Sequence, residues 1–365
     1  MSDWHIFKKR GENNEPHDGI DAFLKDHPPP RWRDFKGEII RTDTPLRPPK
    51  GGNFNEDISE DDSDAKARGE TFQAEDKEVE MVNAALYLRR PLLVTGKPGV
   101  GKSSLAYAVA YQLRLGKVLH WPITTRTILK DGLYHYDAIG RLQELQIERL
   151  KKGEDGSIEP PDMGQYIRLG PLGTAFLPSE RPRVLLIDEI DKSDIDLPND
   201  LLNIFEEGSF EIPELSRLAR SVKDAEVLPH DAKDHEDRVV VREGKVLCRA
   251  FPFVVLTSNA ERELPAPFLR RCLRLDIDKP EKGKLTKIVQ AHFGNADEAG
   301  DKERNHLIQL FLNRRETGDL ATDQLLNAIY LTTQGIDLEN IKIKDKESLL
   351  ETVLKHLNSM GTVGN

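Results

Sequence analysis

Eight consecutive residues of the chain have the types and order of a loop that binds phosphate groups. They are Gly96, Lys97, Pro98, Gly99, Val100, Gly101, Lys102 and Ser103, which fit the pattern G-x-x-x-x-G-K-[ST]. Glycines at this spacing let the backbone turn tightly, so that successive N–H groups point at an anion. The lysine can then reach the outer phosphates of a nucleotide, and the serine hydroxyl can ligate Mg²⁺. We therefore predict a nucleotide site here and include the next residue, Ser104, in it.

A pair of carboxylates that follows an apolar run is the second candidate group. Residues 184–187 are four aliphatic residues, and Asp188 and Glu189 come directly after them. Because a buried strand cannot keep carboxylates inside a sheet, we expect the pair at its carboxyl edge, where parallel α/β sheets bind ligands. Asp188 is then placed to hold Mg²⁺ together with Ser103. Glu189 is placed to orient or deprotonate an attacking water.

The elements that must position these groups follow from the hydrophobic pattern. Short apolar runs predict strands at residues 92–94, 118–121, 183–188, 253–258 and 273–277. Helices are predicted at residues 75–90, 103–115 and 136–152, and strands that alternate with helices are typical of a parallel α/β sheet. From about residue 281 only helices are expected, at residues 306–313, 323–333 and 346–357.

Composition and charge exclude several classes of protein. The chain has 365 residues, of which 38% are hydrophobic and 32% charged, enough for two or three domains with a real core. No apolar run approaches the roughly 20 residues that cross a bilayer, so no membrane association is expected. The formal charge of −10 argues against a general nucleic-acid binder. Two cysteines without a CxxC pair, and an N-terminus without an apolar signal segment, favour a cytoplasmic protein.

Three segments depart from the alternating pattern. Residues 1–74 contain prolines and an acidic run at 56–64, which predicts a partly ordered extension whose island at 32–35 could dock on the core or on a partner. The core is predicted at residues 75–280, with insertions at about 126–180 and 209–250. The second insertion ends in a predicted hairpin around Glu243 and Gly244. A small all-helical domain is predicted at residues 281–365.

Together, these motifs resemble those of an AAA+ ATPase, and most closely the MoxR branch of the helix-2-insert clade. The resemblance covers roughly residues 75–335 and includes Thr257-Ser258-Asn259 after the fourth strand and residues 269–272 before the fifth. It implies a P-loop NTPase αβα sandwich with a parallel five-stranded sheet, the phosphate-loop strand at its centre, and a small all-helical lid domain. The loop at 96–103 would be Walker A, and Asp188 and Glu189 would be Walker B.

The resemblance also implies roles for residues farther along the chain. Asn259 occupies the sensor 1 position, where its amide would hold the attacking water near the γ-phosphate. Arg271 aligns best with the arginine finger, which acts on the nucleotide of a neighbouring subunit, and Arg270 is the second candidate. Gln324 falls near the sensor 2 position but cannot supply a charge, and whether nearby Arg314 or Arg315 substitutes stays open.

The function expected from this resemblance is a Mg²⁺-dependent ATPase that assembles into a ring, a hexamer by analogy, and remodels a protein partner. ATP and Mg²⁺ are the expected cofactors, and a von Willebrand factor A domain protein is a possible partner. One alternative is a nucleic-acid-directed motor, which the pairs Lys151-Lys152 and Arg314-Arg315 keep open. The other is a nucleotide-gated scaffold with little turnover, for which Gln324 leaves room.

Two other groups of residues are interpreted as structural. His230 and His235 are five residues apart among charged neighbours, which indicates a solvated loop rather than a metal site. Cys248 and Cys272 are interpreted as small buried residues rather than nucleophiles.

Overall fold

The computed structural model describes residues 4–9, 16–17, 19–40, 63–152, 162–219, 222–233, 237–316, 318–338, 340–341 and 348–355. Most of the acidic run at 56–64, the prolines at 45–49 and His235 lie outside these residues. In the part of the chain that is described, no helix has both the length and the apolar character needed to cross a membrane.

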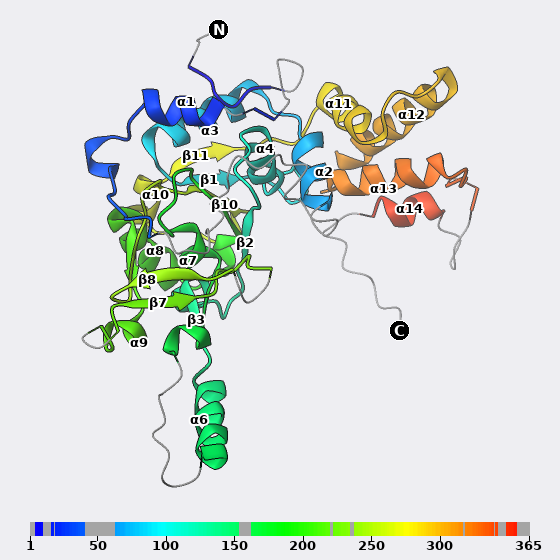
Figure 1. Ribbon diagram of the computed structural model, residues 1–365. Coiled ribbons are helices and arrows are strands. Elements are labelled where there is room, and N and C mark those ends of the chain that lie inside the picture. Colours follow the sequence, from blue (N-terminus) through cyan, green and yellow to red (C-terminus); the bar gives the residue numbers. More distant parts are fainter. Residues whose placement is uncertain are drawn as a thin grey trace.

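Five parallel strands form the central sheet, in the order β11-β1-β10-β5-β2 (Figure 1). They are β1 (Leu92–Thr95), β2 (Leu119–Pro122), β5 (Val184–Asp188), β10 (Phe253–Ser258) and β11 (Leu273–Asp276). All five predicted strands are therefore confirmed within one residue at each end. The expectation that the phosphate-loop strand is central is wrong, because β1 lies second from the edge and β10 lies at the centre. Since β10 pairs with β1 on one side and β5 on the other, its carboxyl end lies between the two predicted motifs.

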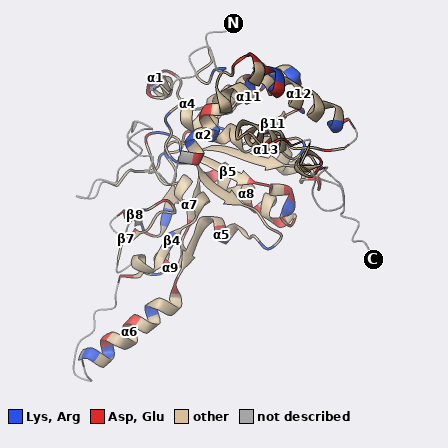
Figure 2. Cartoon of the chain, turned by 90° about the vertical axis from the view of Figure 1, so that its right-hand side faces the viewer, with Lys and Arg blue, Asp and Glu red and all other residues tan. Residues whose placement is uncertain are grey.

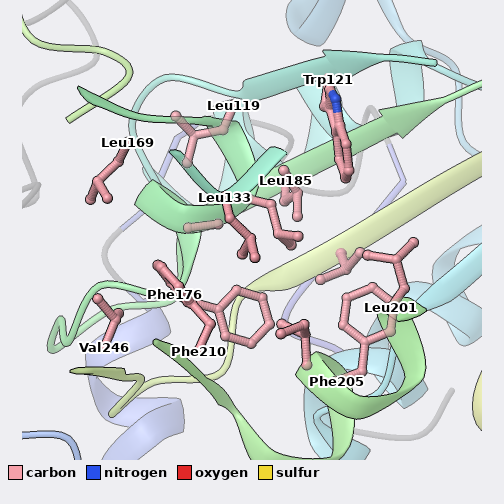
Figure 3. Close-up of a cluster of buried hydrophobic side chains, with 14 of the residues drawn as sticks. Leu119, Trp121, Leu133, Leu169, Phe176, Leu185, Leu201, Phe205, Phe210 and Val246 are labelled. Carbon is pink, nitrogen blue, oxygen red and sulfur yellow. The ribbon is translucent and has the colours of Figure 1, made fainter. Parts of the chain in front are cut away.

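Alternate residues of the inner strands β1, β5 and β10 enter two hydrophobic clusters, one on each face of the sheet. In β5, Leu185 and Ile187 join the cluster that contains Phe176 and Phe205, whereas Leu186 joins the other. Figure 3 shows the first cluster, to which α7 (Pro171–Ala175), α8 (Asp196–Glu207) and α10 (Ala266–Arg271) contribute. Helices α3 (Asp76–Leu88) and α4 (Ser104–Gln112) cover the opposite face. Burial on both faces explains why these inner strands are nearly continuous apolar runs, whereas the edge strands β2 and β11 alternate between buried and exposed residues.

The two insertions form structures of their own. The first contains α5 (Leu129–Leu133), the antiparallel pair β3 (Tyr134–Tyr136) and β4 (Ile167–Leu169), and α6 (Ala138–Lys152), which projects from the body (Figure 1). The second forms a four-stranded sheet, ordered β6 (Ser209–Glu211), β9 (Lys245–Leu247), β8 (Val239–Arg242) and β7 (Asp224–Val227). The predicted hairpin is confirmed, because Glu243 and Gly244 join β8 to β9 with φ of 52° and 71°, as a two-residue type I′ turn requires.

In the described part of the C-terminal region, all the named elements are α-helices. It consists of α11 (Lys282–Phe293), α12 (Glu298–Arg315), α13 (Thr322–Thr333) and α14 (Leu349–Val353). Leu285, Phe311, Leu325 and Ile329 form a core separate from the two clusters of the sheet. Helix α11 was not predicted, and α12 begins eight residues before the predicted helix at 306.

Residues 4–9 and 19–40, which we call the N-terminal strap, pack against the α/β core. Ile6 and Phe7, together with residues of α1 (Gly19–Asp26), enter the cluster under α3 and α4. Asn83 of α3 accepts hydrogen bonds from the amides of Ile6 and Phe7 through Oδ1, at 2.7 and 3.0 Å, and donates Nδ2 to the Phe7 carbonyl at 2.8 Å. Gln112 of α4 binds both the amide and the carbonyl of Lys8, at 2.7 and 3.1 Å. Two buried amides therefore bind the strap backbone as a neighbouring strand would.

The far end of the strap contacts α8 and the second insertion, where the amide of Gly37 donates to the carbonyl of Cys248 at 3.1 Å. Arg33 is buried and donates to the carbonyl of Phe205 at the end of α8, and Phe35 stacks on Phe251 at 5.8 Å. Trp32 is 78% exposed, so the predicted docking of the island at 32–35 on the core is confirmed for Arg33 and Phe35 but not for the tryptophan. Farther along, α2 (Ser63–Thr71) packs on α4.

The cysteines behave as the sequence indicated. Cys248 and Cys272 are both buried, and burial raises the pKa of each thiol to about 12. They are neutral core residues at physiological pH, and the interpretation of both as small buried residues is confirmed.

Asn83→Ala should destabilise the protein, because it leaves the buried amides of Ile6 and Phe7 without acceptors. At about 1–3 kcal/mol for each of the two unsatisfied groups, we expect the free energy of unfolding to fall by about 2–6 kcal/mol. Urea unfolding measures this directly. Asn199→Ala, which truncates an exposed asparagine of α8, is the matched control and should change stability by less than about 0.5 kcal/mol. Equal effects of the two substitutions would show that the strap is not held by Asn83.

Candidate functional site

The predicted phosphate loop connects the carboxyl end of β1 to the first turn of α4. Gly99 and Gly101 have φ of 74° and 93°, a region that side chains rarely adopt, so the loop curls back on itself as a phosphate cradle requires. Lys97 and Pro98 are exposed at the surface of the loop, while Val100 packs against the cluster under α3. Ser104 is the first residue of α4. The loop thus runs into the N-terminus of a helix, whose free N–H groups favour an anion.

Lys102 is turned inward across this loop. Its side chain is 7% exposed, and Nζ donates to the carbonyls of Gly96 and Lys97 at 2.8 and 3.0 Å and to Oδ1 of Asn259 at 2.7 Å. Burial lowers the pKa of Lys102, and the charges of Asp191, Asp188 and Glu189 oppose that shift. The predicted Walker A lysine and the predicted sensor 1 asparagine are therefore in direct contact.

Asp188 receives hydrogen bonds from three other elements at the end of β5. Its Oδ1 accepts from Ser103 Oγ at 2.8 Å and from Thr257 Oγ1 at 2.5 Å, and its Oδ2 lies 3.3 Å from Nε2 of His120 on β2. Burial alone would raise the pKa of Asp188, but the hydrogen bonds from His120, Thr257 and Ser103 outweigh it and lower the pKa to about 2. The carboxylate is thus fully ionised beside a serine hydroxyl, and these are oxygen ligands of the kind that Mg²⁺ prefers.

Glu189 adopts a strained backbone conformation next to Asp188. Its φ of 61° is left-handed, and its amide donates to Thr257 Oγ1 at 2.8 Å. The carboxylate is 40% exposed and pairs with Lys192 at 2.5 Å. Strain of this kind persists only where surrounding contacts enforce it, and it turns the Glu189 side chain out of the sheet edge.

The predicted arginine finger lies far from these groups. Arg270 and Arg271 end α10, directly before β11, whose Leu273 pairs with Leu92 at the start of β1. Arg271 pairs with Glu206 of α8, and Arg270 is exposed. The Arg90 guanidinium donates to the carbonyls of both arginines, with Nε 3.1 Å from the Arg271 oxygen. Both candidates therefore lie at the opposite edge of the sheet from the phosphate loop.

The helical region contacts the phosphate loop directly. The amide of Thr322, at the start of α13, donates to the carbonyl of Gly99 at 3.2 Å. Asp319 pairs with Lys279 at 2.7 Å and with the loop residue Lys97 at 3.6 Å. Gln324 does not face the loop, because its Nε2 donates to the carbonyl of Lys355 at 2.8 Å. No sensor 2 residue is therefore assigned.

Of the two arginines considered as substitutes for sensor 2, Arg315 donates to the carbonyl of Pro280 at 2.8 Å and lies over the Phe311 ring. It is thus engaged inside the helical region. Nothing in the geometry selects Arg314.

Four residues at these sites were missed by the sequence interpretation. His120 contacts Asp188, Asp191 lies beside Asn259, Arg90 binds the end of α10, and Asp319 pairs with the loop lysine. Only Asp191 carried a local signal, since it follows the carboxylate pair by two residues. The other three become recognisable only through contacts between distant segments.

Gly99→Ala should push the helical region away from the phosphate loop. A Cβ at Gly99 would lie 2.2 Å from the Cβ of Ala321 in addition to being strained by the positive φ. Gly294→Ala is the matched control, because Gly294 has a φ of 68° with open space around it. We expect Gly99→Ala to lower the free energy of unfolding by about 1–3 kcal/mol more than the control does. Equal losses in thermal or urea unfolding would contradict the packing of α13 on this loop.

Residues 91–272 match the family model of the AAA domain, dynein-related subfamily. No curated protein matches the chain significantly. A solved structure from Cytophaga hutchinsonii, provisionally described as an ATPase, is 13% identical, with a TM-score of 0.34 over 62% of this chain and 54% of that chain. The chain spans about half the length of that protein, and so low a similarity carries no argument. The family match shows an AAA domain at residues 91–272, and the parallel sheet with its phosphate loop has the architecture of a P-loop NTPase core.

Proposed function

We propose that the chain is a Mg²⁺-dependent ATPase of MoxR type that forms a ring and uses ATP hydrolysis to remodel a protein partner. The observation that carries the ring is the position of Arg271. It precedes the start of β11, whereas the phosphate loop follows the end of β1, and four residues of strand span about 13 Å. An arginine at that edge is too far from the phosphate loop of its own chain, and it could contact the nucleotide of a neighbouring copy, as an arginine finger acting in trans requires.

Within one subunit, the side chains at the sheet edge divide the work of hydrolysis. Lys102 binds the β- and γ-phosphates after exchanging its contacts with the loop carbonyls for phosphate oxygens. Ser103 and Asp188 would hold Mg²⁺, which supplies positive charge against the phosphates. Glu189 orients or deprotonates the attacking water, and Asn259 holds that water near the γ-phosphate.

Two ion pairs support a low activity in the isolated chain. Glu189 is paired with Lys192, and Arg271 is paired with Glu206. Each pair occupies a group that hydrolysis needs, and each is partly exposed, so that exchange for another partner costs little. Assembly would present Arg271 to the neighbouring nucleotide and separate it from Glu206.

The protein partner is supported by the projecting helix α6. Ile139, Leu142 and Leu150 are 70%, 61% and 85% exposed on it, an unusual share of large apolar side chains in contact with water. A von Willebrand factor A domain protein is the partner that the family resemblance implies. Basic residues gather at the outer end of α6 (Figure 2), but a chain with a net charge of −10 is a poor general binder of nucleic acid.

Glu189→Gln should bind ATP and fail to hydrolyse it, because only the activation of water is lost. Turnover should fall by about 100-fold or more, whereas the affinity for a fluorescent ATP analogue stays within about threefold. Lys102→Ala should instead lose tight binding, because the phosphates lose their main cationic partner. Glu263→Gln, which changes an exposed glutamate between β10 and α10, is the control and should leave both turnover and affinity unchanged. Turnover at the wild-type rate in Glu189→Gln would assign the water to another residue.

Arg271→Ala should bind ATP but hydrolyse it slowly, and mixing it with Lys102→Ala protein should restore part of the activity. When equal amounts are mixed, about a quarter of the interfaces join the intact phosphate loop of an Arg271→Ala subunit to the intact Arg271 of a Lys102→Ala subunit. Arg274→Ala, which removes an exposed arginine of β11, should keep full activity alone. Formation of mixed rings is verified by co-purification of differently tagged subunits. Mixed rings without any recovered activity would refute the role of Arg271 in trans.

A further inference from the structure

Asp191 is a buried carboxylate directly behind the catalytic edge of the sheet. It lies in the short 3-10 helix η4 (Ile190–Lys192), which follows Glu189, and is 3% exposed. Its Oδ2 accepts from the amides of Asn259 and Glu261, each at 3.0 Å. Its Oδ1 is buried and has no hydrogen-bond partner in the described part of the chain. Burying a carboxylate this way is costly, so its contacts with the loop after β10 need a reason.

That loop is a strained turn. Ala260 has a φ of 58°, a left-handed conformation that costs a residue with a Cβ roughly 1–2 kcal/mol. Its amide donates to Ser258 Oγ at 2.9 Å, so the amides of residues 259, 260 and 261 are all bound to two side chains. Without the acceptor on Asp191, two of these amides would lose their partners, and the turn could relax.

The backbone of this turn determines where the side-chain amide of Asn259 points. Asn259 Oδ1 accepts from Lys102 Nζ at 2.7 Å, and its Nδ2 lies 3.3 Å from the carboxylate of Glu261. Because β10 lies between β1 and β5, a small rotation at residues 259–261 would move this amide away from the space between Lys102 and Glu189. Misplacement by about 1 Å of a group that orients a reactant can cost about 100-fold in rate.

We propose that Asp191 is a positioning residue for ATP hydrolysis. Its carboxylate oxygen binds two backbone amides and thereby fixes the turn at residues 259–261. The turn in its place holds the side-chain amide of Asn259 beside Lys102. Asp191 is buried behind the sheet edge and acts through Asn259. The inference rests on the role proposed for Asn259 above.

The test compares Asp191→Ala, Asp191→Asn, Asn259→Ala and the double variant Asp191→Ala/Asn259→Ala in the full chain. Turnover at saturating Mg-ATP, affinity for a fluorescent ATP analogue and the melting temperature are measured for each. Asp191→Ala should lower turnover by about 30- to 100-fold, with the affinity changed less than about threefold. Asp191→Asn keeps an oxygen that can accept from both amides, and it should retain at least about a third of the turnover.

The double variant separates positioning from general destabilisation. If Asp191 acts through Asn259, turnover of the double variant should be within about twofold of that of Asn259→Ala alone. If the fold-loss of turnover in the double variant equals the product of the fold-losses in the two single variants, the effects are independent and the inference is overturned. Normal turnover in Asp191→Ala, or the same loss of turnover in Asp191→Asn as in Asp191→Ala, would also overturn it. Asp194→Ala, which removes an exposed carboxylate nearby, is the control and should behave as the unmodified protein. Where Asp191→Ala does not fold, Asp191→Leu fills a similar volume without an acceptor and allows the same comparison.

The outcomes also separate this inference from the proposed function. Normal turnover in Asn259→Ala would refute the role proposed for that residue, and with it the positioning role of Asp191. Impaired Asn259→Ala together with normal Asp191→Ala would refute the positioning role alone.

Discussion

The hydrogen bonds accepted by Asp188 connect the elements on which the site depends. Ser103 comes from the loop after β1, Thr257 from β10 and His120 from β2, and all three converge on a carboxylate at the end of β5. These elements are distant in sequence and meet only because parallel strands end at one edge of the sheet. An ionised carboxylate that accepts several hydrogen bonds is well stabilised, which lets it stay charged in a partly buried position.

The strain stored at this edge is supported by the surrounding packing. Glu189 and Ala260 both have left-handed backbones, and their neighbours bind their amides with side chains rather than with a strand ladder. The three inner strands β1, β10 and β5 are buried on both faces, so the platform under these turns is rigid. A site whose chemistry needs precise placement is thus built on short turns, each tied to a rigid strand end.

The strap and the helical region extend this organisation to both ends of the sheet. The strap binds Asn83 and Gln112 near its start, and its Arg33 binds the carbonyl of Phe205, next to Glu206, the partner of Arg271. At the other end, α13 binds the carbonyl of Gly99. Elements outside the α/β core therefore contact the phosphate loop and the end of α8, which carries Glu206, the ion-pair partner of Arg271. Movement of either element would disturb the phosphate loop or the end of α8.

The sequence by itself determined the five strands, the phosphate loop, the carboxylate pair and the hairpin at Glu243, because each is encoded by local spacing of apolar, glycine or acidic residues. Helix α11 escaped prediction because only Leu285 and Val289 are buried in it, too few for a clear period. Only the tertiary structure decided that β10 is central, because strand order depends on pairing between distant segments. The same reason explains the contacts of Arg90, the burial of Ile6 and Phe7, and the direction of Gln324 toward α14. Each of these depends on long-range packing, on which local periodicity carries no information.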